Sequence, residues 1–300
     1  MQNNDTVRRF VFDNLDMRGC IVSLSESIAT IQQTHHYPPE LAKVLNEFAL
    51  AAVLLHDSLK IDCSVTIQLR STNSDDLPIS LIMADCMTDR KVRAIAEYDN
   101  ELLKPGFAVN LSDLTGALVL AITITPHEGD RYQSIVAMEH DSLANCLESY
   151  FQQSEQLPTW FAFFAQNERG LGIALHSLPK EKVTDEAITL EGRERLKILL
   201  NTLTEKEAFG LSTEQILTRL FHDEACRVFD PSEVAFGCVC SAEKSLNAIK
   251  SLGLEEARAL LAEQSKYGED GLFVDCHFCF QRYDFSPRDI ALLFSEKSEG

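Results

Sequence analysis

The chain has 300 residues, of which 45% are hydrophobic and 24% are charged. This composition is typical of a globular protein with a sizeable core, and it excludes an intrinsically disordered chain. The formal net charge is −19, from 46 acidic and 27 basic residues. Because so acidic a surface repels nucleic-acid phosphates, we expect no nucleic-acid partner. The length predicts two or three domains.

Residues 1–178 are predicted to form the first domain, an α+β core. Residues 63–71 alternate polar and apolar side chains, as in a half-buried strand. Four further β-rich runs of strand length are residues 79–87, 92–98, 117–125 and 132–138. Helical periodicity predicts a long buried helix over residues 41–55, with Pro38 and Pro39 in its first turn, and a second helix over residues 142–153. Strands and helices without regular βαβ alternation indicate an α+β fold with a mostly antiparallel sheet.

Residues 179–237 are predicted to form a helical, highly charged linker region. A leucine stripe at helical spacing begins at Leu196, and residues 212–215 match a capping box that opens another helix. These apolar stripes are narrow and need another surface to bury them, so the stability of the helices is conditional. The simplest interpretation is a linker that docks on the first domain.

Residues 238–300 are predicted to form a small C-terminal domain with three short helices and a β-hairpin. The helices cover residues 241–251, 254–264 and 287–294, and the hairpin covers residues 271–285. So few elements bury too little apolar surface for independent stability, and domains of this size commonly need a metal or disulfides.

Four of the nine cysteines form two close pairs in this domain, Cys238 with Cys240 and Cys276 with Cys279. Two such pairs make a tetrahedral sulfur site, which selects zinc or a similar metal. Zinc held by four thiolates supplies on the order of 10–16 kcal/mol of coupled folding free energy. The single residue between Cys238 and Cys240 is shorter than the usual spacing of structural zinc sites, which favours a redox-labile site. His277 is an alternative ligand, although four cysteines suffice.

The other cysteines stand singly in apolar or periodic contexts, and we interpret them as small buried hydrophobic residues. They are Cys20, Cys63, Cys86, Cys146 and Cys226.

No catalytic motif is found, so we expect no enzyme and no catalytic residue. Residues 169–172 (RGLG) are interpreted as a loop, because they lack the strand–glycine–helix context of a dinucleotide site. His35 and His36 precede two prolines and are assigned to a surface loop. No apolar run is long enough to span a membrane, and residues 1–5 carry no secretory signal. We therefore expect a cytoplasmic protein without a membrane partner.

Two sequence signatures carry a resemblance to a known family. Residues 236–244 (FGCVCSAEK) and 274–279 (VDCHFC) form a cysteine signature, and residues 150–159 (YFQQSEQLPT) form a second signature. Residues 18–27 (RGCIVSLSES) and 131–133 (RYQ) add support. In these stretches, and along essentially its whole length, the chain resembles the heat-shock protein 33 family of redox-regulated molecular chaperones.

The resemblance implies an ATP-independent holdase that binds unfolded or misfolded client proteins and prevents their aggregation under oxidative stress. It implies that Cys238, Cys240, Cys276 and Cys279 bind one Zn²⁺ per chain in the reduced, inactive form. Oxidation would then form the disulfides Cys238–Cys240 and Cys276–Cys279 and release zinc. The resemblance also implies a homodimer in the active form.

Physical chemistry suggests how such a switch would work. Loss of the metal would remove the folding free energy of residues 238–300. If that domain covers the helices of residues 179–237, their apolar stripes would become available to clients. Two alternatives stay open. One is a zinc-stabilised binding module without redox switching. The other is a thiol–disulfide oxidoreductase using Cys276 and Cys279, although such enzymes place their cysteines at a helix start and not on a hairpin.

Overall fold

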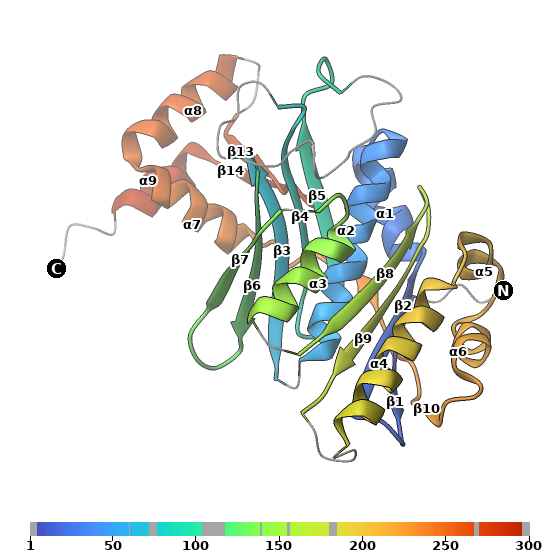
Figure 1. The fold of residues 1–300 in the computed structure, drawn as a ribbon. Coiled ribbons are helices and arrows are strands. Elements are labelled where there is room, and N and C mark those ends of the chain that lie inside the picture. Colours follow the sequence, from blue (N-terminus) through green and yellow to red (C-terminus); the bar gives the residue numbers. More distant parts are fainter. Residues whose placement is uncertain are drawn as a thin grey trace. The chain divides into compact units, whose positions relative to one another are not determined.

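The computed structural model describes residues 5–59, 61–71, 77–103, 118–138, 140–154, 157–179, 185–266 and 270–295. The chain divides into two compact units, Met1–Gly237 and Cys238–Gly300. Helices and strands occur in both units, so the predicted α+β class is confirmed (Figure 1). Within the described ranges, no helix has both the length and the apolar character needed to cross a membrane.

The first unit contains two six-stranded sheets. The first has the order β10–β1–β2–β9–β8, with β11 also paired to β1, and all its pairs are antiparallel. Its strands are β1 (Thr6–Phe12), β2 (Met17–Leu24), β8 (Thr159–Ala165), β9 (Gly170–Ser177), β10 (Cys226–Val228) and β11 (Ser232–Glu233).

The second sheet has the order β12–β5–β4–β3–β6–β7 and is antiparallel except for the β12–β5 pair. Its strands are β3 (Cys63–Ser71), β4 (Ile79–Cys86), β5 (Lys91–Tyr98), β6 (Leu118–Pro126), β7 (Tyr132–Val136) and β12 (Ala235–Phe236). The five strands predicted from alternation and β-rich composition are therefore confirmed, although residue 117 lies outside the described ranges.

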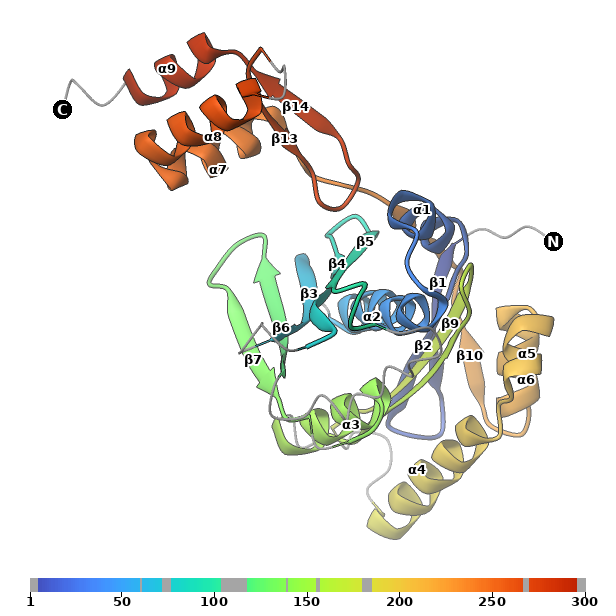
Figure 2. The same cartoon turned by 90° about the horizontal axis from the view of Figure 1, so that it is seen from above.

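Helix α2 (Pro39–Ser58) lies between the two sheets, where Figure 2 shows it nearly end-on. It packs against β3, β4 and β5 on one side and against β2, β8 and β9 on the other. Because both sides face a sheet, every residue from 48 to 57 is buried, which explains the long apolar run that predicted this helix. The second predicted helix is α3 (Leu143–Ser154), whose buried face carries Leu143, Cys146 and Leu147 as expected.

Two local predictions in this unit are wrong. His35 lies in helix α1 (Glu26–His35) and not in a loop, while His36 ends that helix with a φ of 56°. Residues 170–172 lie in strand β9 and not in a loop. The glycines of β9 allow α2 to pack closely on the strand, because a Cβ atom at Gly170 would stand 2.9 Å from Leu50 Cδ1.

Residues 185–236 combine helices and strands. The helices are α4 (Glu186–Asn201), α5 (Glu205–Gly210) and α6 (Thr213–Phe221). The predicted capping box is present, since Ser212 Oγ accepts from the Gln215 amide and the Gln215 side chain accepts from the Ser212 amide. The strands β10, β11 and β12 were not predicted in this stretch, which carries only short pairing segments of two or three residues.

The second unit has the elements that the sequence predicts for residues 238–300. They are α7 (Ala242–Leu252), α8 (Leu254–Lys266), β13 (Leu272–Asp275), β14 (Arg282–Phe285) and α9 (Pro287–Ser295). The two strands form an antiparallel hairpin. Among the described residues of this unit, the buried hydrophobic cluster has only five members: Ile249, Ala257, Leu272, Phe285 and Ile290. A core this small supports the expectation that the unit needs another source of stability.

Candidate metal and redox centre

The second unit brings the four paired cysteines together. Cys238 and Cys240 precede α7, and Cys276 and Cys279 lie at the tip of the β13–β14 hairpin. Their sulfur atoms all lie within 4.8 Å of one another. The Cys238 and Cys276 sulfurs are 3.5 Å apart, and so are those of Cys240 and Cys279.

This spacing fits a four-coordinate metal. With Zn–S bonds of about 2.3 Å, the sulfurs of a tetrahedral site stand about 3.8 Å apart. All four side chains are partly buried, and the group contains no histidine or carboxylate within the described ranges. The four sulfurs can therefore hold a metal ion of the thiolate-preferring class, and His277 lies outside the group.

Backbone hydrogen bonds fix the hairpin tip on which two of the cysteines lie. The Cys276 amide donates to Gln281 O at 3.0 Å, and the Phe280 amide donates back to Cys276 O at 2.8 Å. Phe280 takes a left-handed conformation, with a φ of 54°, to close this turn. An ion pair of 2.9 Å between Arg282 and Asp275 further stabilises the hairpin.

Two further side chains contact the segment that carries the other cysteine pair. Tyr283 donates a hydrogen bond to Cys240 Sγ at 3.1 Å. Lys244 Nζ donates to Val239 O at 2.7 Å and so holds the one-residue turn between Cys238 and Cys240. Both lie four residues beyond a cysteine of the signature, but only the folded hairpin brings the Tyr283 hydroxyl to the Cys240 sulfur.

Comparison with known proteins places the chain in a family. Residues 5–286 match the family model described as Hsp33 protein. The chain is 43% identical to the 33 kDa chaperonin of Azotobacter vinelandii, covering all of this chain and 98% of that protein. It is 38% identical to the 33 kDa chaperonin of Pseudomonas fluorescens, covering 98% of this chain and 95% of that protein. The chain belongs to the Hsp33 family.

A solved structure agrees with this assignment at the level of the fold. The crystal structure of the 33 kDa chaperonin (heat shock protein 33 homolog) of Thermotoga maritima matches with a TM-score of 0.79, covering 99% of both chains. Its sequence identity is 21%, so it supports the shared fold alone. Of the YFQQSEQLPT signature of this Hsp33 chain, residues 155 and 156 lie outside the described ranges.

The five remaining cysteines of this Hsp33 chain lie apart from the centre. Cys20, Cys63, Cys86 and Cys146 are buried and Cys226 is partly buried, as predicted. Burial raises the pKa of Cys20 to about 12 and that of Cys226 to about 11. Because the thiolate is the reactive form, these thiols are poor targets for oxidants.

The amphipathic helices α4–α6 bury their apolar stripes on the first sheet. Their buried members are Leu196, Leu200, Leu203, Ala208, Ile216, Leu217, Leu220 and Phe221. The sheet contributes Phe10, Phe12, Met17, Ile21, Trp160, Leu171, Ile173 and Leu175 to the same cluster. The packing partner of these buried side chains is therefore the sheet of the same unit, as the simplest interpretation of the linker predicted.

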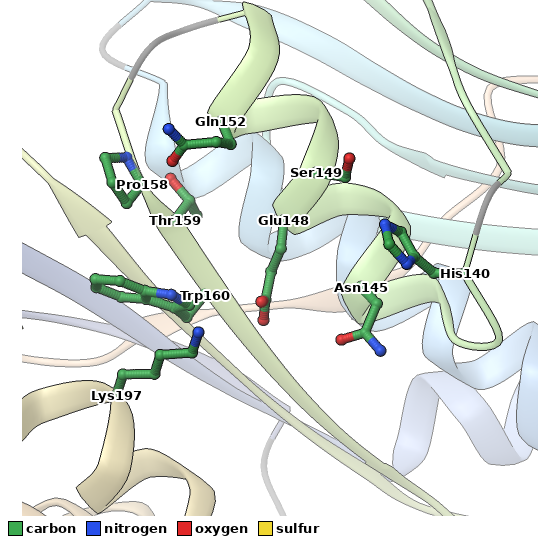
Figure 3. Close-up of a pocket in the computed structure, with 9 residues that line it drawn as sticks. All are labelled: His140, Asn145, Glu148, Ser149, Gln152, Pro158, Thr159, Trp160 and Lys197. Atoms are coloured by element: carbon green, nitrogen blue, oxygen red, sulfur yellow. The ribbon is translucent and has the colours of Figure 1, made fainter. Parts of the chain in front are cut away.

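Helix α4 contacts the first sheet at the edge strand β8. In Figure 3, Lys197 of α4 lies beside the Trp160 ring of β8, with Lys197 Nζ 5.8 Å from the ring centroid. On the other side of the same hollow, Glu148 of α3 accepts a hydrogen bond of 3.0 Å from the Phe161 amide. Burial raises the pKa of Glu148. This carboxylate links α3 to β8, so its role is structural.

The fold also creates a polar cluster that the sequence did not reveal. His176 Nε2 lies 2.6 Å from Ser58 Oγ, and His176 Nδ1 lies 3.2 Å from Thr159 Oγ1. Ser58 Oγ donates its only proton to Leu54 O at 2.7 Å, so we assign the Nε2 proton to the histidine. Burial lowers the pKa of His176 to about 3. So weak a base does not activate a serine, and this cluster does not change the expectation of a non-enzyme.

Proposed function

We propose that this chain is a redox-regulated, ATP-independent molecular chaperone that holds unfolding proteins and prevents their aggregation under oxidative stress. The observation that carries the proposal is the group of four cysteine sulfurs within 4.8 Å, set in a unit with five buried hydrophobic residues in its described part. The name of the relatives, 33 kDa chaperonin, supports the chaperone class. The proposal places the protein in the cytoplasm.

In the reduced, inactive form, Cys238, Cys240, Cys276 and Cys279 hold one Zn²⁺ per chain. Bound zinc supplies folding free energy that the small core of the second unit lacks. The Tyr283 hydroxyl and the backbone of the hairpin orient the sulfurs. Such outer contacts set how firmly ligands are held.

In the oxidised form, Cys238 pairs with Cys240 and Cys276 with Cys279. Each pair of thiolates gives two electrons to one peroxide molecule, which takes up two protons from the solvent and becomes two water molecules, and one S–S bond forms between the two sulfurs. Sulfur contacts of 3.5 Å also run across the pairs, so disulfide formation within the pairs requires the hairpin tip and the segment before α7 to rearrange. Disulfides stay on the reversible part of the cysteine oxidation series, so reduction restores the inactive form.

Only a short stretch of chain connects the cysteines to the helices α4–α6, whose apolar side chains pack on the first sheet. Cys238 follows β12, a two-residue strand held by Ala235 N to Arg90 O at 3.3 Å and Gly237 N to Val92 O at 3.2 Å. We propose that unfolding of residues 238–300 loosens this weak edge and frees residues 179–237 from the core of residues 1–178. Helices α4–α6 then expose their apolar stripes to clients.

The rest of the molecule suits a holdase that must expose apolar surface without precipitating. A net charge of −19 keeps the protein soluble and disfavours nucleic acid as a partner. We propose that unfolded or misfolded proteins are the partners and that the oxidised, active form is a homodimer.

The decisive experiment measures zinc content, free thiols and client aggregation on the same sample. Peroxide with mild heat, or hypochlorous acid, should release one zinc per chain, consume four thiols and suppress aggregation of an unfolding client. The Cys226→Ser variant is the matched control and should behave as the parent does. Loss of zinc without any gain in aggregation suppression would favour a zinc-stabilised module without switching. Catalytic turnover in an insulin-reduction assay would favour the oxidoreductase, which the hairpin position of Cys276 and Cys279 opposes.

A further inference from the structure

The first unit contains an apolar pocket of about 290 Å³ that the chaperone cycle does not use. It lies at the C-terminal end of α2, where both sheets contribute to its wall. The apolar part of the wall includes Leu55, Val65, Ile122, Ile124 and Phe151. Such a concave apolar space with a few polar groups is typical of a small-molecule site.

One charged side chain lines this pocket within the described ranges, and it is Arg18. Its guanidinium donates to Ser58 O at 2.7 Å, while its Nε is buried without a hydrogen-bond partner. No ion pair is formed by Arg18 within the described ranges. A half-buried guanidinium with spare donors is a binding group for a planar anion.

The charges around Arg18 leave an excess of positive charge. Asp57 accepts from Arg9 at 2.7 Å and from Arg90 at 3.2 Å, so its carboxylate is already shared by two guanidiniums. The other titratable neighbours are Cys20, whose thiol is neutral, and His176, whose imidazole is neutral. Among the described residues, three guanidiniums (Arg9, Arg18 and Arg90) therefore surround the carboxylate of Asp57, in a protein whose net charge is −19. The local field attracts an anion although the whole molecule repels anions.

Further polar groups line the pocket beside Arg18. The polar part of the pocket lining includes the hydroxyl groups of Ser58 and Thr159 and the imidazole of His176. Tyr132, which is 53% exposed, also lines the pocket, as does Tyr150, whose hydroxyl donates to Ser134 Oγ at 2.9 Å. A ligand thus meets a cationic, hydrogen-bonding region and an apolar region within one space.

We propose that this pocket binds a small amphipathic monocarboxylate, of the chemical class of the medium-chain fatty acids. The carboxylate accepts hydrogen bonds from Arg18, and the hydrocarbon body packs against Ile122, Ile124 and Phe151. Burial of the tail supplies the apolar part of the affinity, and the guanidinium supplies selectivity for an anionic head. This binding is independent of the proposed redox switch.

The test uses calorimetry on the full, zinc-loaded chain with decanoate as the probe. We expect saturable binding at one site, at least ten-fold tighter for decanoate than for decanol. The Arg18→Gln variant should lose at least ten-fold in decanoate affinity. The matched control is Arg227→Gln, which removes an exposed guanidinium paired with Asp13 and should bind as the parent does.

A second variant keeps the test decisive if Arg18→Gln fails to fold. Ile124→Trp fills the pocket without touching the charge cluster and should abolish decanoate binding, while circular dichroism checks the fold. Any of four outcomes overturns the proposal: no saturable binding of decanoate, equal affinity for decanol, undiminished binding by a folded Arg18→Gln variant, or undiminished binding by Ile124→Trp.

Discussion

The Tyr283 hydroxyl donates a hydrogen bond of 3.1 Å to the sulfur of Cys240. This contact raises the pKa of Tyr283 to about 12, so the phenol keeps its proton and stays a donor. A donor on a thiolate spreads its charge and fixes its direction. Tyr283 is thus a positioning residue for one ligand of the proposed zinc site.

Replacing Tyr283 by Phe removes this donor and keeps the ring. We expect zinc affinity to fall roughly ten-fold, because outer contacts of ligands typically contribute a factor of that order. Peroxide should also release zinc several-fold faster, since the Cys240 thiolate loses its hydrogen bond and becomes more nucleophilic. Competition with a chromophoric chelator measures the affinity. Tyr98→Phe, in the first unit, is the control, and equal affinities of Tyr283→Phe and parent would refute the role.

Removal of the metal should unfold residues 238–300 and spare the core of the first unit. The second unit has five buried hydrophobic residues in its described part, too few to offset its conformational entropy. Treatment with a strong chelator should therefore open protease sites beyond Gly237 and, once the linker is freed, within residues 185–237. Helical circular dichroism should fall by at least the share of α7–α9. The same loss is expected when the four clustered cysteines are changed to Ser, but not in Cys226→Ser. A chelated protein that resists protease as the parent does would contradict this prediction.

Weakening the contact of α6 with the first sheet should partly activate the chaperone without oxidant. Phe221 is 1% exposed and packs edge-on against Phe12, with ring centroids 5.2 Å apart. Phe221→Ala should cost about 3–5 kcal/mol of packing free energy and release the helices from the sheet. Aggregation suppression by the reduced protein is the measurement. Ile198→Ala removes a side chain that is 62% exposed and is the control. If α6 is loosened in the reduced Phe221→Ala protein but client aggregation is not suppressed, release of the helices is not enough for client binding and the prediction is wrong.

Acidification should destabilise the first unit through His176. Burial lowers the pKa of His176 to about 3, whereas the unfolded chain protonates it near 6.5. Between these values the unfolded state binds a proton that the folded state does not, so the free energy of unfolding falls as pH drops. The expected slope is about 1.4 kcal/mol per pH unit below pH 6.5.

The His176→Gln variant isolates this contribution. Urea unfolding at pH 7.5 and 5.5 can be followed by the fluorescence of Trp160, the single tryptophan of the chain. The parent should lose more stability than His176→Gln over this interval, because the variant has no imidazole to protonate at this position. Equal losses in the two proteins would show that His176 does not carry the dependence.

Local patterns in the sequence predict much of the fold. Alternation predicted β3, and the wholly apolar run predicted α2, because each pattern reports which sides of an element are buried. The Ser212 capping box marked the start of α6. The wrong predictions came from residues whose role is set by distant partners. Gly170 is typical of a loop when taken alone, whereas in the structure a Cβ atom at this position would press on the side chain of Leu50.

The order and spacing of the cysteines in the chain are enough to predict the ligand chemistry of the candidate metal centre. The spacing of Cys238, Cys240, Cys276 and Cys279 is a local property, and thiolates prefer soft metals wherever they lie. The tertiary structure decided which groups surround them and what the amphipathic helices cover. Tyr283 of β14 reaches Cys240 only because the hairpin lies against the segment before α7, and Arg18 reaches the α2 end only because β2 packs on that helix. Contacts between residues far apart in the chain depend on the packing of whole elements, and no local pattern records them.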